Sequence, residues 1–449
     1  MNKDLAEIVW DELKVTGRVF LTGGGGVGKT FTTRRVMELA KADGYFPVPT
    51  ASTGIAARNL DEAGSTIHSV LGLGICESYG EWIRIKRNRY SKNKLFTEID
   101  RILLVIDEIS MISAEVFELI NRIITEKYGS KDIKILLVGD TLQLSPVKSE
   151  KFFFQSYYYN DYTPIALTEN KRNDDIVWNI FLNRLRFGEE LNHYDFKFLS
   201  DSGNIHQVSS ANEINDPLVI MLENTNKRVD AINETKLSEL SSEPHMFVTE
   251  YKTSSYEFNT DLTPEEKLTI ETYAQKNKDK FLKEFPLSLI MNYKIGEYVM
   301  ILKNGKDYVN GDRGYIVDIQ TNAKNEIECI EVELLNGNSV MIEKMNYEFY
   351  HPTIINKEGE KIVVSYIPYF PIRPAYAITV HKSQSLSLDH MFYNPMEAFA
   401  DGQVYVALSR LANLGNLYLS TFNLNPYVRV NPRAKQFQKH VEKQYAIDQ

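Results

Sequence analysis

The chain has little cysteine and no excess of positive charge. Its only cysteines among 449 residues are Cys76 and Cys329, too few for a disulfide framework or a zinc site, which fits a reducing compartment. The formal net charge is −9, which disfavours a histone-like protein that is basic overall. A local basic groove for nucleic acid is still compatible with this total, because net charge does not describe how charges are distributed.

Long apolar runs are also absent. No stretch approaches the roughly 18 uninterrupted apolar residues of a membrane span, and residues 1–7 resemble neither a signal peptide nor a transit peptide. We therefore expect a cytoplasmic protein, and the compact chain favours a bacterial or phage origin. The length exceeds the usual limit of one hydrophobic core, so several domains are expected.

The most informative feature that is present is a glycine-rich run. Residues 23–30 read Gly-Gly-Gly-Gly-Val-Gly-Lys-Thr, between an apolar run at 19–21 and a helical pattern at 31–42. This matches the phosphate-binding pattern G-x-x-x-x-G-K-[ST], in which glycines let backbone N–H groups turn toward the β-phosphate. Lys29 would reach the β and γ oxygens, and the Thr30 hydroxyl would bind Mg²⁺. The expected nucleotide site comprises Gly23, Gly24, Gly25, Gly26, Val27, Gly28, Lys29, Thr30 and Phe31.

Acidic residues follow another predicted central strand. Residues 102–106 are continuously apolar, as is typical of a parallel strand buried on both faces, and Asp107 and Glu108 come directly after them. Because the carboxyl edge of such a sheet faces the phosphate crevice, we expect Asp107 to hold Mg²⁺ and Glu108 to act as general base on water. The alternative is an acidic strand end that caps the next helix.

A third predicted strand is followed by a candidate phosphate sensor. Residues 133–138 are mostly apolar, and Gly139-Asp140 and then Gln143 come after them. A polar side chain at a neighbouring strand end can detect the γ-phosphate, so we predict that Gln143 is this sensor. Gly-Asp after a strand is also a common turn, so this signal is weak by itself.

The remaining segments resemble the ordered motifs of superfamily 1B DNA helicases. The likeness is greatest to the Pif-type (petite integration frequency) helicases, with the phage Dda and RecD-type helicases as their nearest relatives. It spans nearly the whole chain. The segments that carry it are residues 50–57, 65–69, 105–111, 139–147, 167–172, 369–384 and 404–410.

This resemblance implies an α/β fold with two RecA-like P-loop domains, each built on a parallel sheet, and with ATP at their interface. The first domain is expected at residues 1–168, with a small wedge insertion at 72–96. The second is expected at 169–237 and 367–449. Residues 238–366 form an insertion, and short apolar runs joined by Asn-Gly turns favour a small β-barrel at about 293–366, similar to a Src-homology-3 domain.

Two arginines of the second half are expected to act across the interface. Hydrolysis leaves negative charge on the γ-phosphoryl oxygens, and an arginine from the facing domain can neutralise it when the cleft is closed. The motif positions implied by the resemblance are Arg172 and Arg410. For Arg172, an ordinary surface arginine beside Lys171 is the alternative.

DNA contacts are predicted at two places. The resemblance assigns the single-strand channel to Thr53, His68, Thr379, His381 and Lys382, although isolated histidines are often structural. Residues 84–94 are the densest basic run, and they fall where relatives carry the wedge that splits the duplex. Such a run is commonly only a solvated face. The expected duplex contacts are Arg84, Lys86, Arg87 and Arg89.

Two departures from the family pattern bear on specificity. Residues 4–7 show no Leu-x-x-x-Gln element that would read adenine, so the preference for ATP over other nucleotides is open. Ser385 stands where the family has glycine, and serine does not accept positive φ freely. The loop around Ser385 is therefore expected to have altered geometry.

Together these features predict an ATP-dependent DNA helicase that moves 5′ to 3′ along single-stranded DNA and unwinds duplexes. ATP and Mg²⁺ are the expected cofactors. Single-stranded DNA and duplex or forked DNA are the expected partners, with single-strand-binding or replication and repair proteins as further candidates, and we expect a monomer in solution. One alternative is an ATP-driven translocase subunit of a larger repair or nuclease complex. Another is a binding module without turnover, which the complete catalytic set disfavours.

Overall fold

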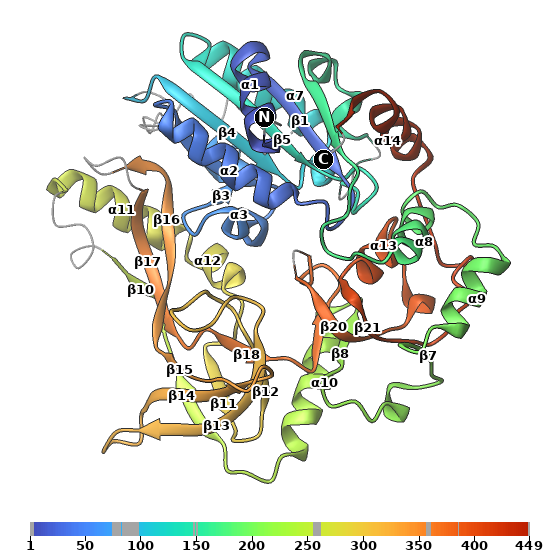
Figure 1. Ribbon diagram of the computed structural model, residues 1–449. Helices are drawn as coiled ribbons and strands as arrows, with labels where there is room; N and C mark the ends of the chain where they lie inside the picture. Colours follow the sequence, from blue (N-terminus) through green and yellow to red (C-terminus); the bar gives the residue numbers. More distant parts are fainter. Residues whose placement is uncertain are drawn as a thin grey trace.

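The computed structural model describes residues 4–73, 82, 98–146, 149, 151–254, 262–355, 361–384 and 386–447. Over these ranges the chain forms two parallel sheets flanked by helices and an antiparallel region that projects from them (Figure 1). The mixed α/β fold expected from the sequence is confirmed. None of the helices within the described ranges is both long and apolar enough to cross a membrane.

The larger parallel sheet carries the glycine-rich loop, and we call it the P-loop sheet. Its strand order is β22-β6-β1-β5-β4-β2-β3. The strands are β1 Arg18–Gly23, β2 Phe46–Ala51, β3 Ser65–Thr66, β4 Arg101–Asp107, β5 Asp132–Gly139, β6 Thr163–Leu167 and β22 Ala446–Ile447.

Helices cover both faces of the P-loop sheet because its central strands are apolar on both sides. In β1, Phe20 packs into the core on one face, whereas Val19 and Leu21 pack into the core on the other. This alternation is the period of two that a strand imposes on its side chains. The helical segments are α1 Leu5–Thr16, α2 Lys29–Ala42, α3 Gly54–Leu60, α4 Ile67–Val70, η1 Ile109–Met111, α7 Ala114–Tyr128, η2 Phe153–Gln155, η3 Tyr157–Asp161 and α14 Pro432–Tyr445.

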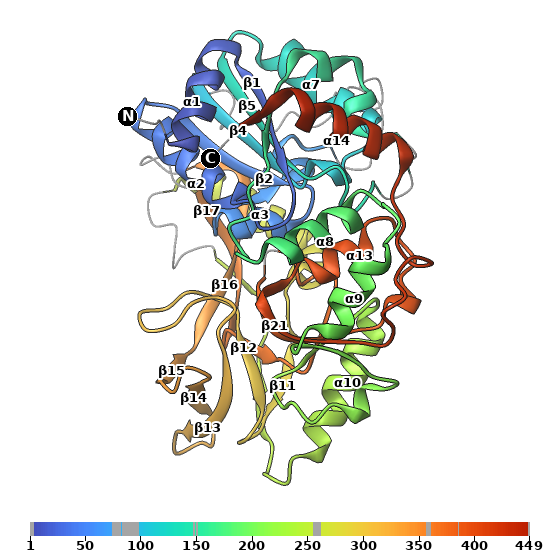
Figure 2. The ribbon, with the colours of Figure 1, turned by 45° about the vertical axis from the view of Figure 1, so that its right-hand side comes forward.

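The second parallel sheet has the strand order β19-β8-β20-β21-β7. Its strands are β7 Ile205–Gln207, β8 Ile220–Glu223, β19 Ala377–Thr379, β20 Leu388–Tyr393 and β21 Leu411–Leu419. Its helical segments are α8 Ile176–Arg186, α9 His193–Asp201, η4 Ala211–Glu213, α10 Asn226–Glu239, η5 Pro395–Glu397 and α13 Gln403–Leu408. Figure 2 shows α8 and α13 directed toward the P-loop sheet, which places them at the boundary between the two sheets.

The antiparallel region lies between α10 and β19 in the chain, and we call it the insertion. Its elements are β9 His245–Val248, β10 Lys252–Thr253, α11 Pro264–Lys276, α12 Lys278–Glu284, β11 Ile290–Tyr293, β12 Tyr298–Ile301, β13 Arg313–Thr321, β14 Ile327–Leu334, β15 Ser339–Glu343, β16 Met345–Ile355, β17 Lys361–Tyr369 and β18 Ile372–Pro374. Five of its strands pair in the open order β15-β14-β13-β12-β18, and no pairing among the described strands closes this sheet into a barrel. The likeness to a Src-homology-3 barrel therefore stays a prediction.

The insertion also contacts the P-loop sheet's helices. The Arg58 guanidinium of α3 lies 4.4 Å from the centre of the Tyr347 ring, and its Nη1 donates a hydrogen bond to the Glu348 carbonyl at 2.8 Å. Lys361 Nζ donates to the carbonyl of Ala63 at 2.7 Å. These contacts hold the β16–β17 hairpin against α3 and the loop that follows it.

One expected assignment differs from the strand pairing. We expected residues 367–449 to belong wholly to the second domain, but β22 pairs with β6 at the edge of the P-loop sheet. The preceding helix α14, dark red in Figure 1, packs on the same part of the molecule. Its Phe437 ring stacks on Phe154 with 3.9 Å between ring centres, so an aromatic contact draws the chain back to the first sheet. The proposed wedge at 72–96 falls almost entirely outside the described residues.

Candidate active site

A cleft of about 880 Å³ lies between the two parallel sheets and continues along the insertion. Residues that the sequence places more than 300 positions apart meet in its walls. The lining includes most of the predicted catalytic and nucleotide-binding side chains from both halves of the chain. These are Gly25, Gly26, Gly28, Lys29, Thr30, Phe31, Asp107, Glu108, Gln143, Arg172 and Arg410, and Lys382, a predicted DNA contact, also lines the cleft.

The glycine-rich loop joins β1 to α2 and curves around the Lys29 ammonium. Gly26 and Gly28 both have φ near +87°, a conformation that glycine adopts without steric cost. A Cβ at Gly26 would lie 2.6 Å from the Asn170 side-chain oxygen, so this position also requires the absence of a side chain. Lys29 Nζ donates to the carbonyls of Gly23 and Gly24, each at 2.8 Å. The loop therefore presents a cation at the start of a helix, which is an arrangement suited to phosphate.

Asp107 and Glu108 stand at the carboxyl end of β4, as expected. The Glu108 backbone N–H donates to Asp107 Oδ1 at 2.8 Å, and Glu108 has φ of 50°, which is rare outside glycine. Burial, and then the neighbouring Glu108, raise the pKa of Asp107 to about 7. Burial also raises the pKa of Glu108, while Lys29 and Arg410 oppose that rise. A carboxylate with a raised pKa is better matched to accept a proton near neutral pH.

Gln143 lies directly beside Asp140. Its Nε2 is 3.5 Å from Asp140 Oδ2, and the side chain is buried, with 7% of the residue exposed. Asp140 Oδ1 accepts from the Leu142 backbone N–H at 3.1 Å, which shapes the turn that carries Gln143. Gln143 therefore faces the cleft from a turn that Asp140 organises.

Arg172, between β6 and α8, and Arg410, between α13 and β21, both lie against the glycine-rich loop. Arg172 Nη1 donates to the Ser409 carbonyl at 2.7 Å, and Arg410 Nη2 donates to Ser409 Oγ at 2.8 Å. A Cβ at Gly25 would lie 3.2 Å from Arg410 Nη2, so this guanidinium lies against the loop. Burial, and then the charge of Arg172, lower the pKa of Arg410 to about 9. The two arginines thus share one serine and face the P-loop sheet together.

The predicted single-strand contacts lie at three places in the fold, which are the start of α3, helix α4, and the end of β19 with the loop that follows it. Thr53 is the N-cap of α3, where its Oγ1 accepts from the Ala56 N–H at 3.3 Å. His68 lies in α4 and is half-buried, and burial followed by the charge of Lys280 lowers its pKa. Thr53 therefore has a local structural role in addition to any role toward DNA.

The three candidates at the end of β19 and in the loop after it differ in exposure. Thr379 is 4% exposed and its Oγ1 accepts from the Lys382 N–H at 3.1 Å, so the hydroxyl shapes the loop rather than facing solvent. His381 is exposed, and Lys382 lines the cleft. Burial and the nearby Arg373 lower the pKa of Lys382. The expected duplex contacts Arg84, Lys86, Arg87 and Arg89 lie outside the described residues, as does Ser385.

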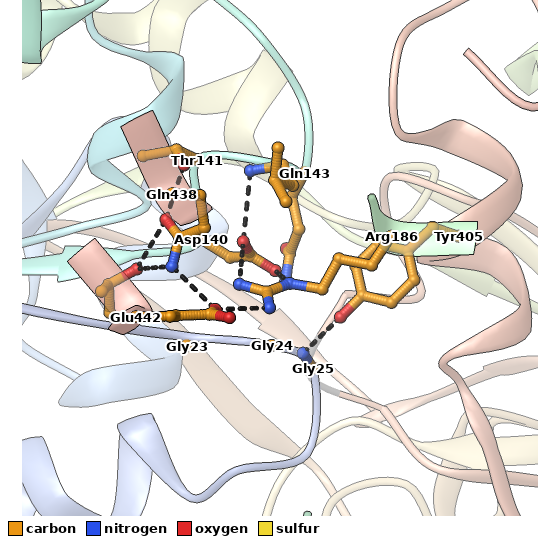
Figure 3. A network of polar contacts seen from close by, with 12 residues as sticks. Gly23, Gly24, Gly25, Asp140, Thr141, Gln143, Arg186, Tyr405, Gln438 and Glu442 are labelled. Carbon is orange, nitrogen blue, oxygen red and sulfur yellow. Dashed lines mark hydrogen bonds and ion pairs between the residues drawn. The ribbon is translucent and has the colours of Figure 1, made fainter. Parts of the chain in front are cut away.

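A polar network that we did not predict from the sequence lies behind the loop and is drawn in Figure 3. Arg186 of α8 pairs with Asp140, and the Tyr405 hydroxyl of α13 accepts from the Gly25 backbone N–H at 2.7 Å. One signal could have identified Arg186, since it extends a helix face whose other members are apolar. Those members, all buried, are Trp178, Phe181, Leu182 and Leu185.

Comparison with known proteins places this site in a family. The family model described as PIF1-like helicase matches residues 3–179. The chain is 32% identical over 431 residues to the ATP-dependent DNA helicase Pif1 of Campylobacter jejuni, covering 91% of this chain and 90% of that protein.

Two solved structures share the fold over nearly the whole chain. Pif1 from a Bacteroides species in complex with ADP-AlF4 is 23% identical, with a TM-score of 0.77 and coverage of 99% of this chain and 98% of that one. Bacteroides Pif1 bound to single-stranded DNA is 24% identical, with a TM-score of 0.62 and the same coverage. Given the similarity to the Campylobacter protein over almost the full length of both chains, this protein belongs to the PIF1-like helicases.

Proposed function

We propose that this protein, an ATP-dependent DNA helicase by family, hydrolyses ATP in the cleft and uses it to move 5′ to 3′ along single-stranded DNA. The observation that carries the proposal is the composition of the cleft. Lys29, Asp107 and Glu108 come from the P-loop sheet, Arg410 comes from the second sheet, between α13 and β21, and Arg172 comes from the segment that joins β6 to α8. A site divided in this way is complete only when the two sheets are close together.

Each side chain has a defined task in this proposal. Lys29 and the loop N–H groups bind the β- and γ-phosphates, and oxygens of Thr30 and Asp107 suit Mg²⁺, a hard cation that prefers oxygen ligands. Mg²⁺ would offset negative charge on the phosphates. Glu108 accepts a proton from the attacking water. The water oxygen bonds to the γ-phosphorus, and the bond between the γ-phosphorus and the β–γ bridging oxygen breaks. Arg172 and Arg410 then neutralise the charge on the γ-phosphoryl oxygens.

The same division explains how hydrolysis could drive movement. When the phosphate bond is broken and the product leaves, Arg172 and Arg410 lose their anionic partner, and the attraction that closes the cleft weakens. Residues carried by both parallel sheets, among them Thr53 after β2 and Lys382 after β19, are the proposed contacts to the DNA strand. Alternate opening and closing would then move one set of contacts relative to the other.

A strand-displacement assay tests the proposal. Labelled 5′-tailed, 3′-tailed and blunt duplexes are incubated with the protein, with and without ATP. We expect unwinding of the 5′-tailed substrate only, and only with ATP. Unwinding of the 3′-tailed duplex would contradict the polarity, and DNA-stimulated hydrolysis without any unwinding would favour a translocase subunit.

Two variants tie this activity to the cleft. Lys29→Ala removes the loop's side-chain cation, and Glu108→Gln removes the proposed base while keeping its shape. We expect both to abolish DNA-stimulated hydrolysis, and Glu108→Gln to retain nucleotide binding. Turnover at the wild-type rate in Glu108→Gln would refute the assignment of Glu108 as general base.

A further inference from the structure

Arg186 is a buried arginine that reaches from one sheet's helices to the other. It is the last residue of α8, and only 4% of it is exposed. Its Nη2 and Nε donate to the two carboxylate oxygens of Asp140, at 2.9 and 3.0 Å. Its Nη1 donates to Glu442 of α14 at 2.6 Å. The Arg186 guanidinium therefore has little freedom to rotate, because it forms a bidentate pair with one carboxylate and also pairs with a second.

This ion pair lies directly behind both the glycine-rich loop and the predicted sensor. A Cβ at Gly24 would lie 3.5 Å from Arg186 Nε, so the guanidinium packs against the loop backbone. Asp140, the carboxylate that Arg186 binds, is 1% exposed and is also the hydrogen-bond acceptor of Gln143 Nε2. A change in the position of Arg186 therefore reaches Gln143 through one shared carboxylate (Figure 3).

Helix α14 reinforces the same arrangement from the other side. Gln438 Nε2 donates to Glu442 Oε1 at 3.0 Å and to Thr22 Oγ1 at 3.1 Å. Its Oε1 accepts from Thr141 Oγ1 at 2.6 Å. Thr22 precedes the loop glycines, and Thr141 follows Asp140, so these bonds connect the ends of β1 and β5 to α14.

We propose that Arg186 is a positioning residue for ATP hydrolysis, which holds Asp140 and through it orients Gln143 when α8 lies against the P-loop sheet. The inference rests on the ATPase activity proposed above. Arg172 and Arg410 line the cleft, but Arg186 does not, and its bonds point to Asp140 and Glu442. Arg186 would therefore orient Gln143 when the second sheet approaches the P-loop sheet, while Arg172 and Arg410 act on the phosphate.

The test is a double-mutant comparison of Arg186→Gln with Gln143→Ala, measured as kcat and KM for ATP with saturating single-stranded DNA. We expect Arg186→Gln to lower kcat at least tenfold while KM and single-strand affinity stay within about threefold. Because Arg186 acts through Gln143, adding Arg186→Gln to Gln143→Ala should lower kcat no more than about twofold further. The inference would be overturned if the kcat losses of the two single variants multiplied in the double variant, or if Arg186→Gln had a normal kcat.

The matched control is Arg184→Gln on the same helix. Arg184 Nη1 pairs with Asp195 at 2.9 Å within the second sheet's own helices, so its loss also removes an ion pair but should leave kcat unchanged. A loss of kcat in this control equal to that in Arg186→Gln would indicate general damage to α8 and overturn the inference.

A second variant guards against failure to fold. Arg186→Gln leaves Asp140 and Glu442 without their cation, whereas Asp140→Asn with Arg186→Gln removes both members of the main pair. A positioning role predicts that the double variant regains thermal stability but not kcat, since Gln143 is still misplaced. Recovery of kcat together with stability would show a merely structural role. If the wild-type protein showed no DNA-stimulated hydrolysis, the proposed function would be overturned as well. If the wild-type protein were active but the kcat losses of Arg186→Gln and Gln143→Ala multiplied in the double variant, only this inference would be overturned.

Discussion

The charged carboxylate of Asp107 is proposed to serve catalysis, but its ionisation makes the folded protein less stable. Its folded-state pKa of about 7 lies above the ordinary 3.8, because burial and Glu108 disfavour its charged form. A raised pKa means that the stability from the protonated form is fully present below about pH 4 and is lost as the pH rises through about 7. The nucleotide-free protein should therefore become less stable between pH 5 and pH 8.

The first prediction follows from this loss of stability with rising pH. Asp107→Asn removes the charge, so it should raise the free energy of unfolding at pH 8 by on the order of 1 to 3 kcal/mol, and much less at pH 5. Thermal unfolding with a chelator at both pH values measures this, and DNA-stimulated hydrolysis should be lost. The exposed Asp201→Asn serves as control. An equal change at both pH values would contradict the assigned cause.

The second prediction concerns the two arginines that line the cleft. Arg172→Ala and Arg410→Ala should each lower turnover by orders of magnitude, because each removes a charge that is needed mainly in the transition state. Affinity for single-stranded DNA without nucleotide should stay within a few fold. If DNA affinity fell as much as turnover, the arginines would belong to the strand channel instead. Steady-state hydrolysis and fluorescence binding on the same preparations separate the two cases.

At the scale of elements, α14 is the clearest departure from expectation. It lies near the end of the chain yet packs on the first sheet, where Phe437 stacks on Phe154 with planes only 4° apart. The helix also carries Gln438 and Glu442, which reach the residues behind the glycine-rich loop. Its position is therefore linked to the cleft as well as to the core.

The third prediction tests that packing. Phe437→Ala should lower the free energy of unfolding by about 2 kcal/mol, since it removes a half-buried aromatic stack. Lys443→Ala, an exposed change on the same helix, should stay within about 0.5 kcal/mol. Denaturant unfolding of both variants provides the measurement. A Phe437→Ala protein as stable as Lys443→Ala would mean that α14 contributes little to the core.

Helix α11 illustrates what local sequence could and could not reveal. Residues 238–292 are polar and acidic, with only weak hydrophobic periodicity, yet α11 begins at Pro264. Its start is marked by a capping box, because Thr263 and Glu266 satisfy each other's backbone N–H groups, with proline at the first helical position. The start was therefore readable, whereas the packing that stabilises the helix against β17 was not.

The whole molecule is the scale at which duplex unwinding must be explained. The fourth prediction is that replacing Arg84, Lys86, Arg87 and Arg89 with Ala slows unwinding of a 5′-tailed duplex. Hydrolysis stimulated by single-stranded DNA should barely change, because those four residues belong to neither the predicted phosphate site nor the predicted strand channel. The slope of fork affinity against salt should become shallower by about one unit for each lost phosphate contact.

Unwinding rate, hydrolysis and the salt slope should be measured on one preparation of that variant. A solvated basic face would leave all three unchanged, and this result would remove residues 84–94 from the DNA-binding surface. A loss of hydrolysis would instead place the run beside the strand channel.

The sequence by itself determined the features that depend on neighbours along the chain. The glycine-rich loop, the carboxylates at the end of β4 and the Asn336-Gly337 turn, where Gly337 has φ of 85°, are local patterns with local steric causes. The buried strands were also recognisable, because burial on both faces demands continuous apolar residues.

Only the tertiary structure decided which distant side chains meet. Arg186 and Asp140 are 46 positions apart, and Gln438 and Thr22 are 416 positions apart. The return of β22 to the P-loop sheet is of the same kind. Such pairings leave no periodic or spaced signal, because their geometry follows from how helices and sheets pack after they form. A buried arginine finds its carboxylates only once α8, α14 and the ends of β1 and β5 have been brought together.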